Sequence, residues 1–155
     1  MSSGWYTVIL FVHVLAGATW VGAGVLIQGH AESVLRKGGH AAADRMLEEF
    51  GWATKWLFLP MPLLALATGI VLVVGNPGIG FGDLWVIVAL SLFVLSLILA
   101  GGIGGVYEKR LATYREQGTV ESAAYGRDFR TLLRINAIEM VAVLTIVGMM
   151  VFKPI

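Results

Sequence analysis

Two ionisable residues, His13 and Glu139, lie inside long apolar runs of this chain. An ionisable side chain in hydrocarbon is costly unless it faces a partner, a cavity or a bound group, so each is a candidate functional residue. A neutral imidazole can ligate a metal or carry a proton, and a carboxylate can support proton or charge balance. We therefore expect function to depend on what surrounds these two side chains.

His13 begins a row of residues with helical spacing. Gly17, Trp20 and Gly24 follow it at i+4, i+7 and i+11, so the four side chains share one helix face. Large rings alternate there with glycine, which suits either close helix approach or a flat ligand lying against the backbone. Two interpretations stay open. His13 handles a ligand or a proton, or it hydrogen-bonds a neighbouring carbonyl or threonine within tight helix packing.

A second polar group, Arg134, Asn136 and Glu139, opens the last apolar run. Asn136 and Glu139 are helix neighbours at i, i+3, whereas Arg134 is five residues from Glu139 and poorly placed to pair with it. Glu139 is expected to find its partner on another helix or in a cytoplasmic arginine. It differs from His13 by roughly 9 Å in depth if the hydrocarbon is ~30 Å thick, which is too far for a direct hydrogen bond.

Met61 stands between two prolines near the middle of the second apolar run. The prolines predict a kink that frees backbone carbonyls. The chain has no cysteine, so thiolate metal sites and iron–sulfur clusters are excluded. Copper held by His13 and Met61 is compatible with that composition, although scattered methionine more often fills gaps in a core.

Composition places these residues in a membrane. The chain is 57% hydrophobic and 14% charged, with a mean hydropathy of +0.81, against roughly 25% charged in soluble domains. The sequence has no basic patch interleaved with aromatic residues, so it gives no indication of nucleic-acid binding. We predict an all-α integral membrane four-helix bundle and a single domain over residues 1–155, embedded in the lipid bilayer. The expected spans are residues 5–28, 51–74, 84–105 and 134–152.

The connections set the expected orientation. Residues 29–50 form a polar connection with a turn at 37–40 and a short helix after it, and residues 106–133 form a charged one broken at 117–119. The residues from Gly75 to Asp83 make a tight turn. Of the 11 Lys and Arg residues, ten lie in these two connections or, as Lys55 and Arg134 do, close beside them, and only Lys153 lies on the opposite side. The positive-inside rule then puts both termini on the outer side of a bacterial cytoplasmic (inner) membrane.

Three segments carry a resemblance to known families. The run from His13 to Gly24 resembles the histidine-led first helix of CopD copper-resistance proteins, HemJ and an allied group of predicted integral membrane proteins of unknown function. Pro62 with Thr68-Gly69 resembles their second helix. Arg134, Asn136 and Glu139, followed by an apolar run into Lys153-Pro154, are similar to the end of HemJ. The likeness is closest to the allied group.

HemJ-like proteins imply a b-type heme held by the first-helix histidine, which is His13 by position, and oxidation of protoporphyrinogen. The family uses a third-helix lysine as second heme ligand, but the span from Leu84 to Gly105 contains none. Its last helix has adjacent Asn and Glu followed by proline, whereas Asn136 and Glu139 are separated here and no proline follows. These departures argue against protoporphyrinogen oxidase activity and leave a heme-dependent oxidoreductase open.

Three functions follow from these observations. The leading prediction is a b-type heme-binding or redox-accessory protein with His13 as axial ligand. Its cofactor-binding residues would be Gly17, Trp20, Gly24, Arg134, Asn136 and Glu139. The first alternative is a transporter or channel for a small solute or a metal ion such as copper, with His13, Met61 and Glu139 along a path. The second is a non-catalytic assembly subunit in a homo-oligomer or with a membrane partner, using Gly101 and Gly105 as a contact face.

Overall fold

The computed structural model describes residues 3–153, and of residues 3, 54 and 55 it describes the backbone alone. The expected all-α fold is confirmed, because the described residues form helices and turns with no strand between 3 and 153. Pro154 and the side chain of Lys55 lie outside this description. The elements are α1 (Ser3–Glu49), α2 (Gly51–Ala53), η1 (Thr54–Phe58), α3 (Pro60–Gly75), α4 (Leu84–Leu97), η2 (Ile98–Gly104), α5 (Gly105–Glu116) and α6 (Ala123–Phe152).

Four helical segments of the described chain are long and apolar enough to cross a membrane: Gly4–Glu49, Gly51–Gly75, Leu84–Glu116 and Ala123–Phe152. Large apolar side chains are exposed along all of them, among them Phe11, Leu26, Val74, Ile138 and Phe152. Such surfaces are unfavourable in water but match hydrocarbon, and helices satisfy their own backbone hydrogen bonds there. These exposed apolar surfaces are therefore suited to face lipid.

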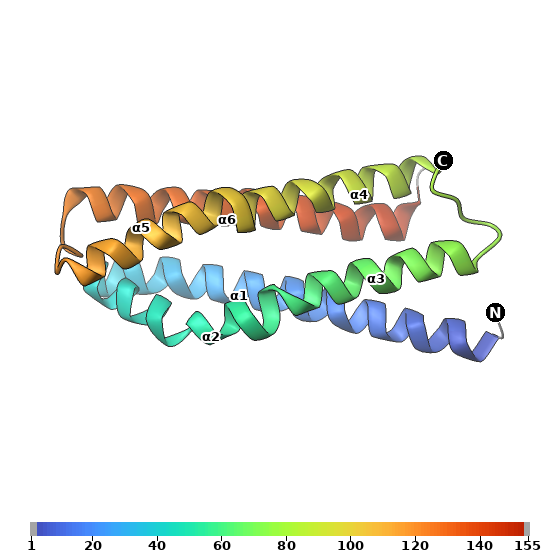
Figure 1. Cartoon of the computed structure of the whole chain (residues 1–155), viewed down its shortest axis with the longest axis horizontal. Helices are drawn as coiled ribbons and strands as arrows, with labels where there is room; N and C mark the ends of the chain where they lie inside the picture. Colours follow the sequence, from blue (N-terminus) through green and yellow to red (C-terminus); the bar gives the residue numbers. More distant parts are fainter. Residues whose placement is uncertain (1–2, 154–155) are drawn as a thin grey trace.

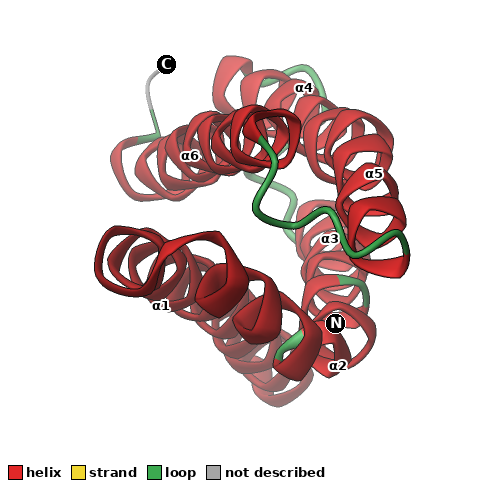
Figure 2. Cartoon of the chain, turned by 90° about the vertical axis from the view of Figure 1, so that its left-hand side faces the viewer, coloured by secondary structure: helices red, strands yellow, loops and turns green. Residues whose placement is uncertain are grey.

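The helices run side by side along one axis (Figure 1). Both described chain ends and the turn at residues 76–83 lie at the same end of the bundle, which we call the termini end. The bend within α1 and the turn between α5 and α6 lie at the opposite, basic end. The largest interfaces join α1 to α3 and α4 to α6, and α1 also packs on α6. The end-on view shows these helices arranged around a common centre (Figure 2).

Two buried clusters lie between the helices. One contains Trp20, Ala89, Phe93, Val143 and Ile146 from α1, α4 and α6. The other contains Ala31, Ala43, Met46, Leu111, Tyr125, Phe129 and Leu132 from α1, α5 and α6. The second cluster uses parts of α1, α5 and α6 that lie beyond the four predicted spans. The helices therefore pack together outside the apolar segments as well as within them.

The helices extend further than the apolar runs predicted. α1 continues through residues 29–38, which were expected to be a polar connection, and is interrupted only at Gly39 with φ 72° and ψ −165°. That positive φ favours glycine and confirms the turn expected at residues 37–40. Residues 106–116 are likewise helical. Charged residues can continue a helix beyond the membrane because water solvates them, so the end of an apolar run does not mark the end of a helix.

The break predicted at residues 117–119 is confirmed. Gly118 has φ 66°, and the Ser122 hydroxyl accepts a hydrogen bond of 3.2 Å from the Tyr125 amide. A serine at this position satisfies one of the free N–H groups of a helix start, so α6 begins directly after it. The basic end is thus closed by a short turn rather than by a long loop.

Two π-helical segments, η1 and η2, interrupt the second and third of the four long helical segments. η1 ends shortly before Pro60, which begins α3 at a position where proline is tolerated, so the irregular helical turns lie on the N-terminal side of the prolines. In η2, a Cβ added to Gly104 would lie 3.0 Å from the Leu99 carbonyl oxygen. This glycine therefore has a local reason in the wide helical turn.

Candidate functional site

His13 is half-buried on α1 and faces α3. Its Nδ1 atom lies 2.8 Å from the Ala65 carbonyl oxygen and 3.1 Å from the Thr68 hydroxyl oxygen. The Thr68 hydroxyl itself donates to the Leu64 carbonyl at 2.6 Å, so its oxygen is left to accept. Because both partners of Nδ1 act as acceptors, Nδ1 carries the proton, and in a neutral ring Nε2 keeps its lone pair.

This arrangement is the one that metal-ligating histidines use. Such a histidine donates its second ring N–H to a carbonyl or carboxylate, which fixes the tautomer and the ring plane. It also fits a histidine that accepts and releases a proton through Nε2. The hydrogen bond to the Ala65 carbonyl therefore orients His13 without consuming the nitrogen that does chemistry.

Gly69 makes room for the imidazole. A Cβ at this position would lie 3.1 Å from His13 Cε1 and 3.5 Å from Nδ1, which is tighter than ordinary contact. Thr68 and Gly69 are adjacent, so one supplies an acceptor and the other supplies space. The Thr68-Gly69 pair that resembled a family motif thus has a direct role around His13.

His13 opens onto a cavity near the termini end, which we call the termini-end cavity. Its volume is about 380 Å³, within the roughly 300–1,000 Å³ of small-molecule sites. The lining comes from α1, α3, α4 and α6 and is mostly aliphatic and aromatic, as with Trp20, Val86 and Phe93. Its few polar or polarisable groups include Tyr6, His13, Met150 and Lys153.

A second cavity of about 620 Å³ lies toward the basic end, and we call it the basic-end cavity. Glu139 and Asn136 line it from α6, which brings the predicted i, i+3 pair to one surface. Its other polar lining groups are Gln28, Ser96, Glu108 and Arg115. This cavity is therefore richer in hydrogen-bonding atoms than the one beside His13.

Residues 7–154 match a family described as predicted integral membrane protein (DUF2269). The chain belongs to this family. It is accordingly a multi-pass integral membrane protein, as the four apolar helices require. Comparison with curated proteins and comparison with solved structures each gave no match.

In this DUF2269 protein the predicted site residues are divided between the two cavities. His13 and Gly17 line the termini-end cavity, whereas Gly24, Asn136 and Glu139 line the basic-end cavity. Trp20 lines both, and Phe93, packed edge-on at a centroid distance of 5.9 Å, lies beside it in the termini-end cavity. His13 and Glu139 thus face different spaces, in agreement with the depth argument from the sequence.

Arg134 and Met61 are placed differently from the other predicted residues. Arg134 is exposed and is absent from the lining of both cavities. Met61 packs against the cluster around Trp20 and also lines neither cavity. A Cβ at Gly24 would meet the end of the Met140 side chain, so Gly24 serves the close approach of α1 and α6.

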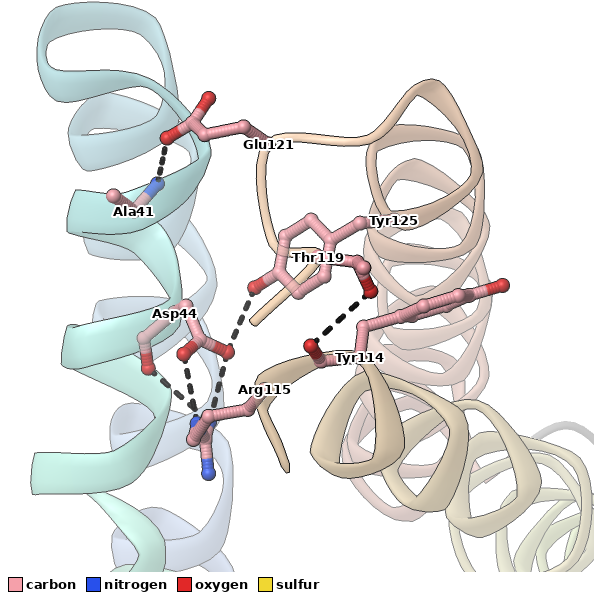
Figure 3. Close-up of polar contacts among 7 residues, drawn as sticks. All are labelled: Ala41, Asp44, Tyr114, Arg115, Thr119, Glu121 and Tyr125. Carbon is pink, nitrogen blue, oxygen red and sulfur yellow. Dashed lines mark hydrogen bonds and ion pairs between the residues drawn. The ribbon is translucent and has the colours of Figure 1, made fainter. Parts of the chain in front are cut away.

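Sequence reasoning missed a polar cluster at the basic end (Figure 3). Arg115 donates two hydrogen bonds to the Asp44 carboxylate, from Nε to Oδ2 at 2.7 Å and from Nη2 to Oδ1 at 2.9 Å, and a third from Nη2 to the Asp44 carbonyl oxygen at 3.3 Å. The Tyr125 hydroxyl donates to Asp44 Oδ1 at 3.1 Å. The cluster ties α1, α5 and α6 together, and Arg115 also lines the basic-end cavity. In the sequence, Asp44 is one acidic residue among several in a segment expected to be a polar connection.

Gln28 and Ser96 were also missed as lining residues of the basic-end cavity. Gln28 stands at the end of a predicted span, and Ser96 is a small hydroxyl inside an apolar run, so neither carried a charge or a motif. Each leaves a buried oxygen without a hydrogen-bond partner, Gln28 Oε1 and Ser96 Oγ. Whether a buried oxygen finds a hydrogen-bond partner depends on how the helices pack, which the sequence does not indicate.

Proposed function

We propose that this membrane protein binds a b-type heme in the termini-end cavity, with His13 Nε2 as an axial ligand. The observation that carries the proposal is the hydrogen bond from His13 Nδ1 to the Ala65 carbonyl at 2.8 Å. It holds the ring in the tautomer that leaves Nε2 available to iron. A heme bound there would supply one-electron redox chemistry.

The residues around the cavity fit such a group. The lining is largely apolar, and Gly17 beside His13 has no atom within 4 Å of an added Cβ, so open space lies over that part of α1. Met150 offers a thioether in the same cavity, and His/Met ligation is one of the established axial pairs. The Lys153 ammonium lines the cavity as well and is suited to a heme propionate.

The proposal narrows the set predicted from sequence. It retains His13, Gly17 and Trp20 and adds Met150 and Lys153. It leaves out Gly24, Arg134, Asn136 and Glu139, which lie elsewhere. A redox-accessory role fits these residues, and protoporphyrinogen oxidation forms no part of it. Kinship with CopD and HemJ stays a prediction from the motifs.

The test is an absorption spectrum of the full chain purified in detergent after expression with added hemin. We expect a Soret band that is lost in His13→Ala and kept in His30→Ala, which removes an exposed histidine from the same helix. Met150→Leu is expected to keep the band but shift its position and the reduction potential. No Soret band in the wild type, or an equal band in His13→Ala, would contradict the proposal.

We also propose that the termini end faces outward and the basic end faces the cytoplasm of a bacterial inner membrane. The support is the location of the basic residues along the sequence. The chain has no cysteine, so single substitutions report topology directly. In intact cells a membrane-impermeant maleimide should label Gly78→Cys and spare Gln117→Cys. Labelling of Gln117→Cys alone would reverse the orientation.

Transport of a small solute is the second candidate. It is favoured by Trp20, which lines both cavities, so a path along the bundle would pass this one residue. For a metal ion the support is weaker, because no group of three or more His, Asp or Glu side chains gathers among the described residues. Copper uptake by cells carrying the wild type or Met61→Leu tests that reading, and equal uptake would end it.

A further inference from the structure

Glu139 lies in an apolar helix, lines the basic-end cavity and forms no ion pair with the side chains that the structure describes. The ion pairs in the described part of the chain are Arg110 with Asp128 and Arg115 with Asp44. Arg115 also lines the cavity, but its guanidinium is already bound by Asp44. A carboxylate at this depth needs a countercharge or a hydrogen-bond donor, and these lining residues leave that need unmet.

Gln28 lines the same cavity and holds a second acceptor. Its Nε2 donates to Glu32 Oε1 at 3.0 Å and to the Leu133 carbonyl at 3.0 Å. Because a carboxylate and a carbonyl can only accept, the amide cannot be turned the other way. Gln28 Oε1 is thereby left buried and without a partner.

Ser96 supplies the third. It is 1% exposed, lines the cavity, and its Oγ has no hydrogen-bond partner. Other helical hydroxyls in the chain donate to the carbonyl four residues earlier, as Ser91 does to Ile87 at 2.8 Å and Thr145 does to Val141 at 2.8 Å. An unpaired buried hydroxyl is costly unless something in the cavity binds it.

The backbone around these groups is also irregular. η1 contributes Phe58 to the cavity, and η2 contributes Ala100 and Gly101. π-helical turns are rare and often occur at functional sites. Both π-helical segments of the described chain therefore border the cavity that Gln28 and Ser96 line.

We propose that the basic-end cavity binds a small primary ammonium cation. An ammonium group has three N–H donors and no acceptor. Two side chains that line the cavity, from α1 and α4, have an oxygen without a hydrogen-bond partner, Gln28 Oε1 and Ser96 Oγ, and α6 adds the Glu139 carboxylate, which forms no ion pair among the described residues. A volume of about 620 Å³ exceeds what a bare metal ion would fill. The aliphatic lining, including Leu59, Leu97 and Leu132, suits a short alkyl chain.

Isothermal titration calorimetry on the full chain in detergent tests this with two probes. n-Butylammonium carries the three N–H donors, and n-butyltrimethylammonium has the same charge and chain but none. We expect saturable 1:1 binding of n-butylammonium and at least about tenfold weaker binding of its trimethyl analogue. Glu139→Gln should weaken n-butylammonium binding by at least about tenfold, and Ser96→Ala by about fivefold.

Ser91→Ala is the matched control, since it removes a hydroxyl from the same helix that already bonds to its own backbone. It should leave the affinity unchanged, as should His13→Ala, which separates this site from the heme proposal. Absence of saturable n-butylammonium binding, equal affinity for both cations, or unchanged affinity in Ser96→Ala would overturn the proposal. Should Glu139→Gln fail to fold, Ser96→Ala with the two cations still decides it.

Discussion

The two cavities of this bundle differ in how their polar atoms are satisfied. In the termini-end cavity His13 has its Nδ1 bound by the Ala65 carbonyl, so a single nitrogen remains for a ligand. In the basic-end cavity Gln28 Oε1 and Ser96 Oγ are left unpaired. The bundle thus has one cavity beside a histidine whose ring is held by a hydrogen bond, and another lined by two side chains whose buried oxygens have no hydrogen-bond partner.

The difference comes from the neighbouring helix in each case. α3 turns a carbonyl and a threonine hydroxyl toward His13 and removes a side chain at Gly69. Around Glu139 no described arginine is unpaired within the cavity lining, because Asp44 holds Arg115. The role of a polar residue in a membrane helix therefore depends more on the groups that contact it than on its residue type.

The largest expected loss of stability comes from a change at the basic end alone. Asp44→Ala removes the partner of both Arg115 and Tyr125 and leaves a partly buried guanidinium unpaired. We expect a loss of about 3 kcal/mol in the free energy of unfolding. Denaturation in mixed micelles, followed by tryptophan fluorescence, measures it.

Asp128→Ala is the matched control for this change. The pair of Arg110 with Asp128 is long at 3.9 Å, and the arginine side chain is 56% exposed. Such pairs contribute less than about 1 kcal/mol. Equal losses in the two variants would show that the Asp44 cluster does not hold the basic end together.

The second change removes the residue shared by the two cavities. Trp20→Ala deletes a side chain that is 6% exposed and packs edge-on against Phe93. Lipid is as apolar as the protein interior, so the transfer term largely vanishes, and we expect the cavity and packing terms to cost about 2 kcal/mol. Trp5→Ala, at a residue 68% exposed, should cost little. Similar losses of stability in both variants would argue against tight packing of Trp20 between the two cavities.

The smallest effect concerns the termini-end cavity alone. Gly69→Ala places a methyl group 3.1 Å from His13 Cε1, so the ring shifts and its bond to the Ala65 carbonyl weakens. A loss of about 1 kcal/mol in the free energy of unfolding is expected, together with a lower occupancy by the proposed heme. Gly17→Ala, which meets no atom within 4 Å, is the control for stability. Heme occupancy in Gly69→Ala is measured from the Soret absorbance, and an unchanged value would show that ring placement is unimportant.

Much of this fold could be predicted because apolar length and glycine chemistry act locally. The four spans follow from hydrocarbon thickness, and the turns at Gly39 and Gly118 follow from residues that favour positive φ. The spacing from His13 to Trp20 also predicted one helix face, and both residues line the termini-end cavity. The sequence could not predict that the cofactor residues are divided between two cavities. Depth in the membrane does not determine how one helix is rotated about its axis relative to its neighbours.

What the sequence missed depends on partners far apart in the chain. Ser91 and Ser96 are both single serines in the same apolar run. The Ser91 hydroxyl donates to a carbonyl of its own helix, whereas the Ser96 hydroxyl has no hydrogen-bond partner. Asp44 and Arg115 lie in segments expected to be connections, where charge is ordinarily solvated. Only their helical continuation brings them together with Tyr125.

The length of α1 before its bend has a mechanical consequence. Residues 3–38 form one helix, which at about 1.5 Å per residue is roughly 50 Å long. The hydrocarbon layer is roughly 30 Å thick, so this helix projects well beyond it, and the Asp44 cluster lies past the Gly39 bend at the projecting end. A thinner or thicker bilayer changes the tilt of such a helix. Because His13 and the projecting end share it, membrane thickness acts on both at once.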